Sequence, residues 1–522
     1  MDRGGIAQIL VVALSLMLIG GSQSANILGI FTSTSPSHLI VHMSVAKVLA
    51  ENGHNLTIIT VLKPPVKHKD FNIIQVPLDQ DQENQLNAAM ANMAGKNFNM
   101  IRMLIDKLGQ MRIVFDVGAT ALKDPRVIDL YENKDNKFDL AIVGHFLTEY
   151  QLGLAHKLKV PVILSATMPP SDSVGGIIGN PKDNSITGIG LKERFRTMAL
   201  SKAFRIFNWI QDSRNIEHYK NLYGDDPTMP KYEDLSKNIS LIFCNSHGLS
   251  EGPIRANLPG IVEIGGIQVK EEPAELPQNL KEFIGNATHG AILLSLGSNL
   301  KGDYIKPNTV KDMFKVLSQL KERVVWKWEN LENTPGKSDN ILYSKWLPQD
   351  DVLAHPNIKV FITHAGKGGI SEAQYHGKPM LALPVMADQP QNALAMAKAG
   401  FGLSLPLLEL EEQTFRENLL DVLNNPKYGQ SIKQFSQLYR DRPLTARQTV
   451  LYWVNYVLRY HGAAHLQSPV VHMDFLQANN LDIYILLFTI FAISVWLFKI
   501  SITFIIRKVF KKKSVSKKLK NQ

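Results

Sequence analysis

The chain has 522 residues, of which 45% are hydrophobic and 20% are charged, so it is long enough to form two large hydrophobic cores. The formal net charge is +10, but much of this excess comes from a basic cluster in the last sixteen residues: Arg507, Lys508, Lys511, Lys512, Lys513, Lys517, Lys518 and Lys520. Because the rest of the chain is close to neutral, we exclude a nucleic-acid partner.

Residues 1–24 have the layout of a secretory signal peptide. The basic residue Arg3 precedes an apolar run from Ile9 to Ile19, which is followed by small residues up to Ser24. We expect cleavage near Ser24, which would leave Ala25 first. A short buried helix or an uncleaved anchor is the alternative, although the run is too short to span a bilayer comfortably.

The N-terminal half, residues 25–270, has the pattern of a parallel α/β domain. A strand at 25–31, the turn-forming stretch TSTSPS, a helix at 38–51 and a strand at 56–61 make a βαβ unit. Further buried strands are predicted at 138–143 and 160–165, with a helix at 150–158 between them. Residues 192–219 have apolar residues at helical spacing. We favour a packing helix there over one lying near a ligand pocket or against the membrane.

The pattern restarts after EEPAELP at 271–277, which we interpret as a linker between two domains. The second α/β domain, residues 271–475, is predicted to have a helix at 311–320 and strands at 291–296, 324–327, 360–363 and 380–383. Two such domains in series predict that ligands bind between them, at the carboxyl ends of the strands.

Residues 483–506 form an apolar run long enough for a transmembrane helix, interrupted only by Lys499. The basic tail at 507–522 follows at once, so the positive-inside rule predicts a cytosolic tail and a single-pass type I topology. Lys518 and Lys520 have the spacing of a retrieval signal for the endoplasmic reticulum membrane; a plain stop-transfer tail is the alternative.

Three sequons begin at Asn55, Asn238 and Asn286, and a lumenal chain could be glycosylated at each if it is exposed. Asn55 borders a predicted strand, so we expect it to be partly buried. The only cysteine, Cys244, allows no intramolecular disulfide and lies in an apolar run, which predicts a core position.

Residues 361–393 carry the main candidate site. The strand at 360–363 runs into AGKGG and then a helical pattern from about Ile370, an arrangement that directs backbone amides at a phosphate group. His364 can donate to a phosphate oxygen, and Gly366 and Gly368 permit close approach of the backbone. Glu372 can accept from ribose hydroxyl groups.

Residues on either side complete a nucleotide-sugar site. Trp346 and Gln349 offer an aromatic face and an amide suited to a flat base, and Asp388 and Gln389 can bind sugar hydroxyl groups. The alternative is that Trp346 is a core residue and Asp388 caps a helix. It does not explain why residues suited to bind a base, a phosphate, a ribose and a sugar occur together in one segment.

This segment resembles the signature of the UDP-glycosyltransferases, which include the UDP-glucuronosyltransferases and the insect UDP-glucosyltransferases. The resemblance covers the mature chain and includes SLGS at 295–298, WLPQ at 346–349 and DVLAHP at 351–356. It implies a GT-B fold of two Rossmann-like domains and inverting transfer from a UDP-sugar to a small lipophilic acceptor. Neither a metal nor another cofactor is implied.

The resemblance also assigns roles to residues of the site. Trp346 and Gln349 would hold uracil and Glu372 the ribose. Ser298 and His364 would hold the diphosphate, and Asp388 with Gln389 the sugar. WKWEN at 326–330 is similar to insect members, which implies glucose as the sugar and conjugation or detoxification as the role. Homo- and hetero-oligomers are both compatible with the sequence.

The motif departs from the family pattern after His364. Ala365 stands where the family usually has glycine, and its methyl group is expected to crowd the phosphate. Gly368 stands where a polar residue is common. Lys367 is unusual beside a diphosphate; it either supplies charge or points to solvent, and we favour solvent.

His38 matches the family's catalytic histidine, the base that takes the proton of the acceptor hydroxyl. Its acidic partner usually follows a Phe-Asp pair, here Phe138 and Asp139, but the expected position holds Gly144. Asp139 is expected at the far end of the strand, and Glu149 lies nearer the following helix. One hypothesis is an active transferase with a relocated acid, with water or with His38 alone. The other is a weak or inactive relative that binds ligands or regulates partner transferases.

Overall fold

The structure is a computed structural model that describes residues 24–94, 100–180, 190–250 and 256–519. The chain divides into two compact units, one ending at Gln467 and the other running from Ser468 to the C-terminus. The predicted signal peptide lies outside the described residues, apart from Ser24.

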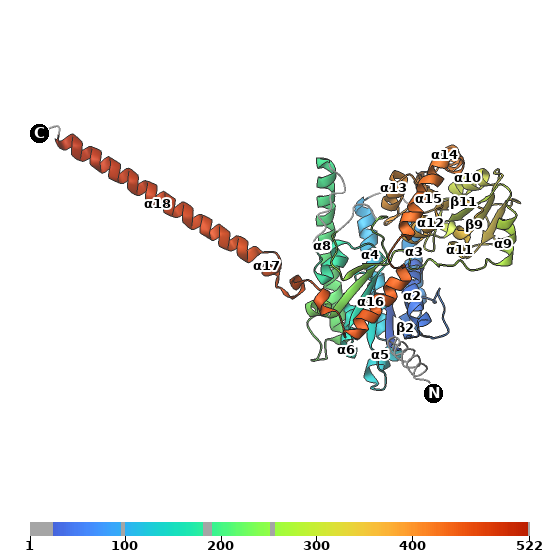
Figure 1. Ribbon diagram of the computed structural model, residues 1–522, viewed down its shortest axis with the longest axis horizontal. Coiled ribbons are helices and arrows are strands. Elements are labelled where there is room, and N and C mark those ends of the chain that lie inside the picture. Colours follow the sequence, from blue (N-terminus) through green and yellow to red (C-terminus); the bar gives the residue numbers. More distant parts are fainter. Residues whose placement is uncertain (1–23, 95–99, 181–189, 251–255, 520–522) are drawn as a thin grey trace, which may run out of the picture. The chain divides into compact units, whose positions relative to one another are not determined.

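The first unit contains two parallel sheets (Figure 1). In the seven-stranded sheet the order is β3-β2-β1-β4-β5-β6-β7. Its strands are β1 (Asn26–Phe31), β2 (Asn55–Thr60), β3 (Phe71–Gln75), β4 (Leu140–His145), β5 (Val162–Ala166), β6 (Ile239–Cys244) and β7 (Ile261–Glu263). Its described helices are α2 (Pro36–Glu51), α3 (Gln80–Ala94), α4 (Met100–Leu122), α5 (Pro125–Glu132), α6 (Leu152–Leu158), α7 (Asp172–Gly175) and α8 (Leu191–Tyr223).

The six-stranded sheet has the order β10-β9-β8-β11-β12-β13. Its strands are β8 (Ala291–Ser295), β9 (Arg323–Lys327), β10 (Ile341–Ser344), β11 (Ile358–Thr363), β12 (Met380–Ala382) and β13 (Gly402–Ser404). The helices along this part are α9 (Gln278–Gly285), α10 (Pro307–Leu317), α11 (Gln349–Ala354), α12 (Lys367–His376), α13 (Gln389–Lys398), α14 (Glu412–Asn424), α15 (Pro426–Arg440) and α16 (Ala446–Arg459).

Each sheet has an apolar core on both faces. Leu28 and Ile30 of β1 belong to one core cluster, whereas Ile27 and Phe31 belong to another. Neighbouring side chains of a strand point to opposite faces, so this division shows that helices bury both sides of the sheet. Residues of α16 belong to the same cluster as Ile27. This helix follows the second sheet in the sequence, yet it packs against α2 of the N-terminal domain.

Two element boundaries differ from the sequence prediction in ways that affect the site. Strand β4 begins at Leu140 and continues to His145, so Gly144 and His145 lie within the sheet rather than after it. Helix α12 begins at Lys367 rather than near Ile370, with Gly366 at its N-cap. The backbone amides of its first turn therefore lie directly after β11.

Helix α8 is only partly a packing helix, so the favoured interpretation of 192–219 is wrong for some of its described apolar residues. Phe207 is buried, but Phe195, Met198 and Ile206 are 64%, 55% and 61% exposed. These three residues belong to the apolar pattern from which a packing helix is predicted, but their side chains are not packed against the core.

In the second unit, α17 (Phe475–Ala478) precedes α18 (Leu481–Leu519). Residues 481–508 of α18 are long and apolar enough to cross a membrane, with a mean hydropathy of 2.3. The helix extends beyond the predicted span of 483–506 at both ends and includes most of the basic tail.

Candidate functional site

The predicted diphosphate residues lie at the carboxyl ends of two paired strands, β8 and β11. Ser298 follows β8 and His364 follows β11. A Cβ atom at Gly297 or Gly366 would lie 2.5 or 2.3 Å from the His364 ring, so these glycines make room for the imidazole. Gly297 also has a φ of +83°, which glycine adopts without strain.

Two polar atoms of this group are buried and have no hydrogen-bond partner among the described residues: Ser298 Oγ and His364 Nδ1. Buried polar atoms normally have a partner, so both are available to a ligand. Burial lowers the pKa of His364 to about 4, so the ring is neutral at pH 7 and donates from one nitrogen only. Together with the α12 amides, the pair can bind an anion.

Ala365 does not crowd this anion site as the sequence suggested. Its side chain is fully buried in the core formed by Phe361, Ala373 and their neighbours. Its backbone has a φ of +62°, in the left-handed region where alanine is disfavoured by about 1 kcal/mol.

We expect Ala365→Gly to leave both stability and donor affinity nearly unchanged. The substitution relieves about 1 kcal/mol of backbone strain. It also loses about 0.8 kcal/mol of methyl burial and raises the entropy of the unfolded chain. Thermal unfolding and calorimetric titration with UDP check this; a tenfold gain in UDP affinity would show that the methyl group does obstruct the phosphate.

Lys367, the first residue of α12, is turned inward rather than toward solvent, so the favoured interpretation of this residue is wrong. Its Nζ atom donates to Ser250 Oγ at 3.3 Å. Burial lowers the pKa of Lys367 to about 7, and the nearby Asp388 carboxylate opposes that shift. Lys367 is also the first residue of the helix whose amides follow β11, and its side chain lies within electrostatic reach of Asp388.

The residues predicted to bind the uracil base and the ribose lie on α11, on α12 and in the segment before α11. Trp346 is 55% exposed, so it is not a core tryptophan and its ring can stack on a ligand. Gln349 Nε2, at the start of α11, donates to Glu372 Oε2 of α12 at 2.6 Å. Burial, with a smaller contribution from Asp350, raises the pKa of Glu372 to about 8.

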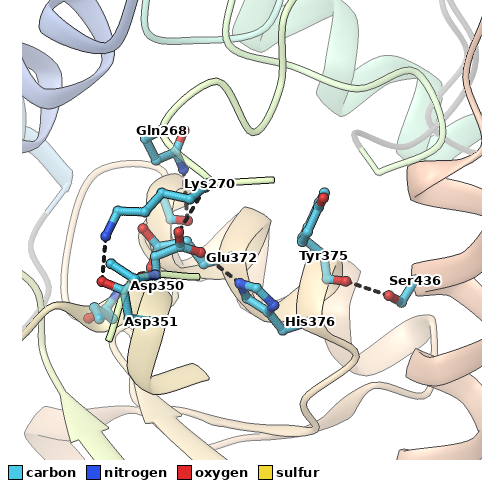
Figure 2. A network of polar contacts seen from close by, with 11 residues as sticks. Gln268, Lys270, Asp350, Asp351, Glu372, Tyr375, His376 and Ser436 are labelled. Carbon is cyan, nitrogen blue, oxygen red and sulfur yellow. Dashed lines mark hydrogen bonds and ion pairs between the residues drawn. The ribbon is translucent and has the colours of Figure 1, made fainter. Parts of the chain in front are cut away.

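A polar network beside Glu372 connects Lys270, the residue before the linker, to α11 and α12, and Figure 2 shows it from close by. The backbone amide of Lys270 donates to Asp350 Oδ2 at 2.8 Å, and the Lys270 ammonium pairs with Asp351. His376 Nε2 is 2.7 Å from Asp350 Oδ1. These contacts hold α11 against α12 and so fix the positions of Gln349 and Glu372.

The predicted sugar residues lie at the start of α13. Asp388 occupies the N-cap position but makes no side-chain capping bond; its carboxylate is exposed and accepts from Asn392 Nδ2 at 2.6 Å. Gln389 Oε1 accepts from the amides of Val385 and Met386 at 2.9 and 3.0 Å, so the predicted sugar contact of this residue would have to come from its amide nitrogen.

Asn392 is a site residue that sequence reasoning missed. Besides Asp388, its Nδ2 atom donates to the Ala365 carbonyl at 3.1 Å, so it joins the predicted sugar residues to the loop after β11. Its spacing of one helical turn from Asp388 was the available signal.

His38 lies on α2, within electrostatic reach of Asp388, a residue of the predicted donor site. Ser35 and Asn299 bond to each other at 3.1 to 3.3 Å, which joins the start of α2 to the loop after β8. Burial lowers the pKa of His38 to about 4, and Asp388 is close enough to oppose that shift. The ring is therefore neutral at pH 7, as a base must be, and packs 5.0 Å from the Phe146 ring.

Neither nearby carboxylate on the N-terminal domain pairs with His38. Asp139 accepts from the Asn26 amide at 2.8 Å, at the opposite end of the sheet, as expected. Glu149 is 3.7 Å from His145 Nε2 and accepts from Asn215 Nδ2 at 2.8 Å. Burial raises the pKa of Glu149 to about 7. Neither Asp139 nor Glu149 is therefore positioned as an acidic partner of His38.

The remaining predictions concern surface and core positions. Asn55, Asn238 and Asn286 are all exposed, so the expected partial burial of Asn55, the first residue of β2, is wrong. Cys244 is buried. Across the described ranges, no group of three or more His, Cys, Asp or Glu side chains is placed to hold a metal ion.

Comparison with known proteins places this arrangement in a family. The family model for UDP-glucoronosyl and UDP-glucosyl transferases matches residues 28–516. UDP-glycosyltransferase UGT5 of Dactylopius coccus is 32% identical over 486 residues, covering 88% of each chain. UDP-glucuronosyltransferase 2B15 of Homo sapiens is 31% identical over 323 residues, covering 61% of this chain and 59% of its own.

A solved UDP-glucosyltransferase from Polygonum tinctorium has a TM-score of 0.55 at 16% identity, over 84% of this chain and 99% of its own. At that identity the likeness shows the fold alone. CalG4, the calicheamicin glycosyltransferase, likewise has a TM-score of 0.52 at 15% identity, over 84% of this chain and 99% of its own. The fold is GT-B, and the chain belongs to the UDP-glycosyltransferase family.

Proposed function

We propose that this protein transfers glucose from UDP-glucose to a hydroxyl group of a small lipophilic acceptor, with inversion at the anomeric carbon. The observation that carries the proposal is the bond between Ser35 and Asn299, which joins the start of the helix that holds His38 to the loop after β8. Asp388, at the predicted sugar position, lies within electrostatic reach of His38. The reaction would be a hexosyl transfer with the UDP-sugar as co-substrate. Glucose is favoured because one relative is named UDP-glucosyltransferase 2, from Dactylopius coccus, at 29% identity.

In the proposed reaction the donor binds across the second domain. Uracil stacks on Trp346, and the ribose hydroxyl groups bond to Glu372. The diphosphate lies against the first turn of α12, where Ser298 and His364 have unused polar atoms. The sugar bonds to Asp388 and Gln389.

The chemistry then follows from the position of His38. It takes the proton of the acceptor hydroxyl as the oxygen attacks the anomeric carbon from the side opposite UDP. The bond to UDP breaks, and the electron pair goes to the diphosphate. The α12 dipole, His364 and Lys367 stabilise the charge that develops there.

We further propose that the protein is anchored in the endoplasmic reticulum membrane by residues 483–506. The catalytic domains would be lumenal and the tail cytosolic. The apolar helix at 481–508 supports a membrane anchor. The role that we propose for the anchored enzyme is conjugation of foreign or endogenous compounds.

A donor and acceptor screen tests the reaction. Membranes containing the full chain are incubated with UDP-glucose, UDP-glucuronate or UDP-galactose and a panel of phenols, and acceptor-dependent release of UDP is measured. We expect UDP-glucose to give the highest kcat/KM. UDP binding without turnover for any pair would support the other candidate, a ligand-binding or regulatory relative, which the glycine at position 144 favours.

A further inference from the structure

The ring of His42 occupies the space beside Gly144, where the family pattern has its acid. A Cβ atom at position 144 would lie 2.9 Å from both Cδ2 and Nε2 of His42. His42 follows His38 by one turn of α2, so both side chains lie on the same face of the helix. A carboxylate at position 144 would have to share its place with this imidazole.

His42 is held rigidly in that place. Its Nδ1 atom is 2.9 Å from Ser165 Oγ of β5, and its ring stacks on Phe31 with centroids 5.3 Å apart. The side chain is 2% exposed. Because Ser165 engages Nδ1, Nε2 is the nitrogen left on the edge that faces Gly144.

The surrounding groups keep His42 uncharged. Burial, with smaller contributions from the neighbouring His38 and His145, lowers the pKa of His42 to about 3. Asp388 faces His38 from the other domain, and Glu149 lies beside His145. A neutral imidazole that donates from Nδ1 to Ser165 has a lone pair on Nε2, so it can accept a hydrogen bond there.

We propose that His42 is the positioning residue that replaces the missing carboxylate, accepting at Nε2 a hydrogen bond from the ring of His38. His38 would be oriented by this bond and would use its other nitrogen to take the proton of the acceptor hydroxyl. No proton passes to His42. The inference rests on the proposed function, because it concerns the base of the same transfer reaction.

The first test replaces His42 by phenylalanine, which keeps the ring volume and the stacking on Phe31 but has no nitrogen. We expect acceptor kcat/KM to fall by about 10- to 1,000-fold, with UDP affinity unchanged. The acid limb of the pH profile should move to lower pH, because the imidazolium of His38 loses its stabilising partner. His42→Gln, whose amide oxygen can accept near the Nε2 position, should recover part of the rate.

The second test places the carboxylate back. Gly144→Asp alone should not raise the rate, because its Cβ atom collides with the held ring of His42. His42→Ala with Gly144→Asp removes that collision, and we expect it to be at least tenfold faster than His42→Ala alone. If this double variant does not bind UDP, the rates and pH profiles of His42→Phe and His42→Gln test the role of His42 instead.

Controls separate the outcomes. His54→Phe removes another buried histidine, whose Nδ1 accepts from the Ala25 amide at 3.3 Å at the opposite end of the sheet, and should leave the pH profile unchanged. A parental rate and pH profile in His42→Phe, or a faster enzyme from Gly144→Asp alone, would overturn the role of His42. Absence of transfer by the parent protein would overturn the proposed function as well.

Discussion

Replacing His38 by alanine is expected to reduce kcat by about 10²- to 10⁴-fold while UDP binds as tightly as before. Of the two histidines of α2, His38 is the one whose pKa is influenced by Asp388. His38 is not among the residues predicted to bind UDP. Single-turnover UDP release and calorimetric titration with UDP measure the two quantities separately.

The pH dependence of the parent protein gives an independent check on His38. A base must be unprotonated, and burial lowers the pKa of His38 to about 4. Activity that depends on His38 should therefore be retained through neutral pH and lost as the pH falls through about 4. A matched variant, His54→Phe, should keep the parental rate. An unchanged kcat in His38→Ala would assign the base to another group.

The main fold could be predicted because its strands leave a strong local signal. Residues 25–61 alternate apolar runs with turn residues and a helix, and β1, α2 and β2 appear there within two residues of the expected limits. Strands β3, β6, β7, β10 and β13 were not predicted. Of these, β7 and β13 have only three residues each, too few for a periodic pattern. Gly144 lies in β4 because the ladder with β5 extends two residues past the apolar run.

That the candidate donor residues lie together was predictable, because they follow strands of one parallel sheet. Their partners were not, since they are set by contacts far apart in the sequence. The bond between Ser35 and Asn299 joins positions separated by 264 residues, and it is one of the contacts that bring α2 to the donor site. Burial of Lys367 and the packing of His42 on Gly144 likewise depend on tertiary structure, so a sequence pattern cannot show them.

Replacing Lys367 by methionine is expected to raise the KM for UDP-glucose by about 10- to 100-fold, with a smaller effect on kcat. Methionine has a similar length but no charge, and a charge-assisted bond to phosphate contributes about 1.5–3 kcal/mol. Initial rates at varied UDP-glucose give KM directly. An unchanged KM would show that the ammonium group does not meet the donor.

The same contact predicts how donor affinity depends on pH. Burial lowers the pKa of Lys367 to about 7 in the free protein, and the diphosphate favours the charged ammonium. Binding should therefore take up a proton, so the affinity for UDP-glucose is highest below pH 7 and declines as the pH rises above it. UDP-glucose suits this test because its diphosphate, esterified at both ends, keeps a constant charge in this range.

Lys378 provides the matched control for this pH dependence. It is also a buried lysine, burial lowers its pKa to about 8, and its Nζ donates to the carbonyls of His355 and Ile358 at 2.9 and 3.0 Å. Lys378→Met should lower thermal stability but keep the decline of UDP-glucose affinity with pH, whereas Lys367→Met should abolish that decline. Retention of the decline in Lys367→Met would assign the titration to another group and leave the diphosphate to the α12 amides, Ser298 and His364.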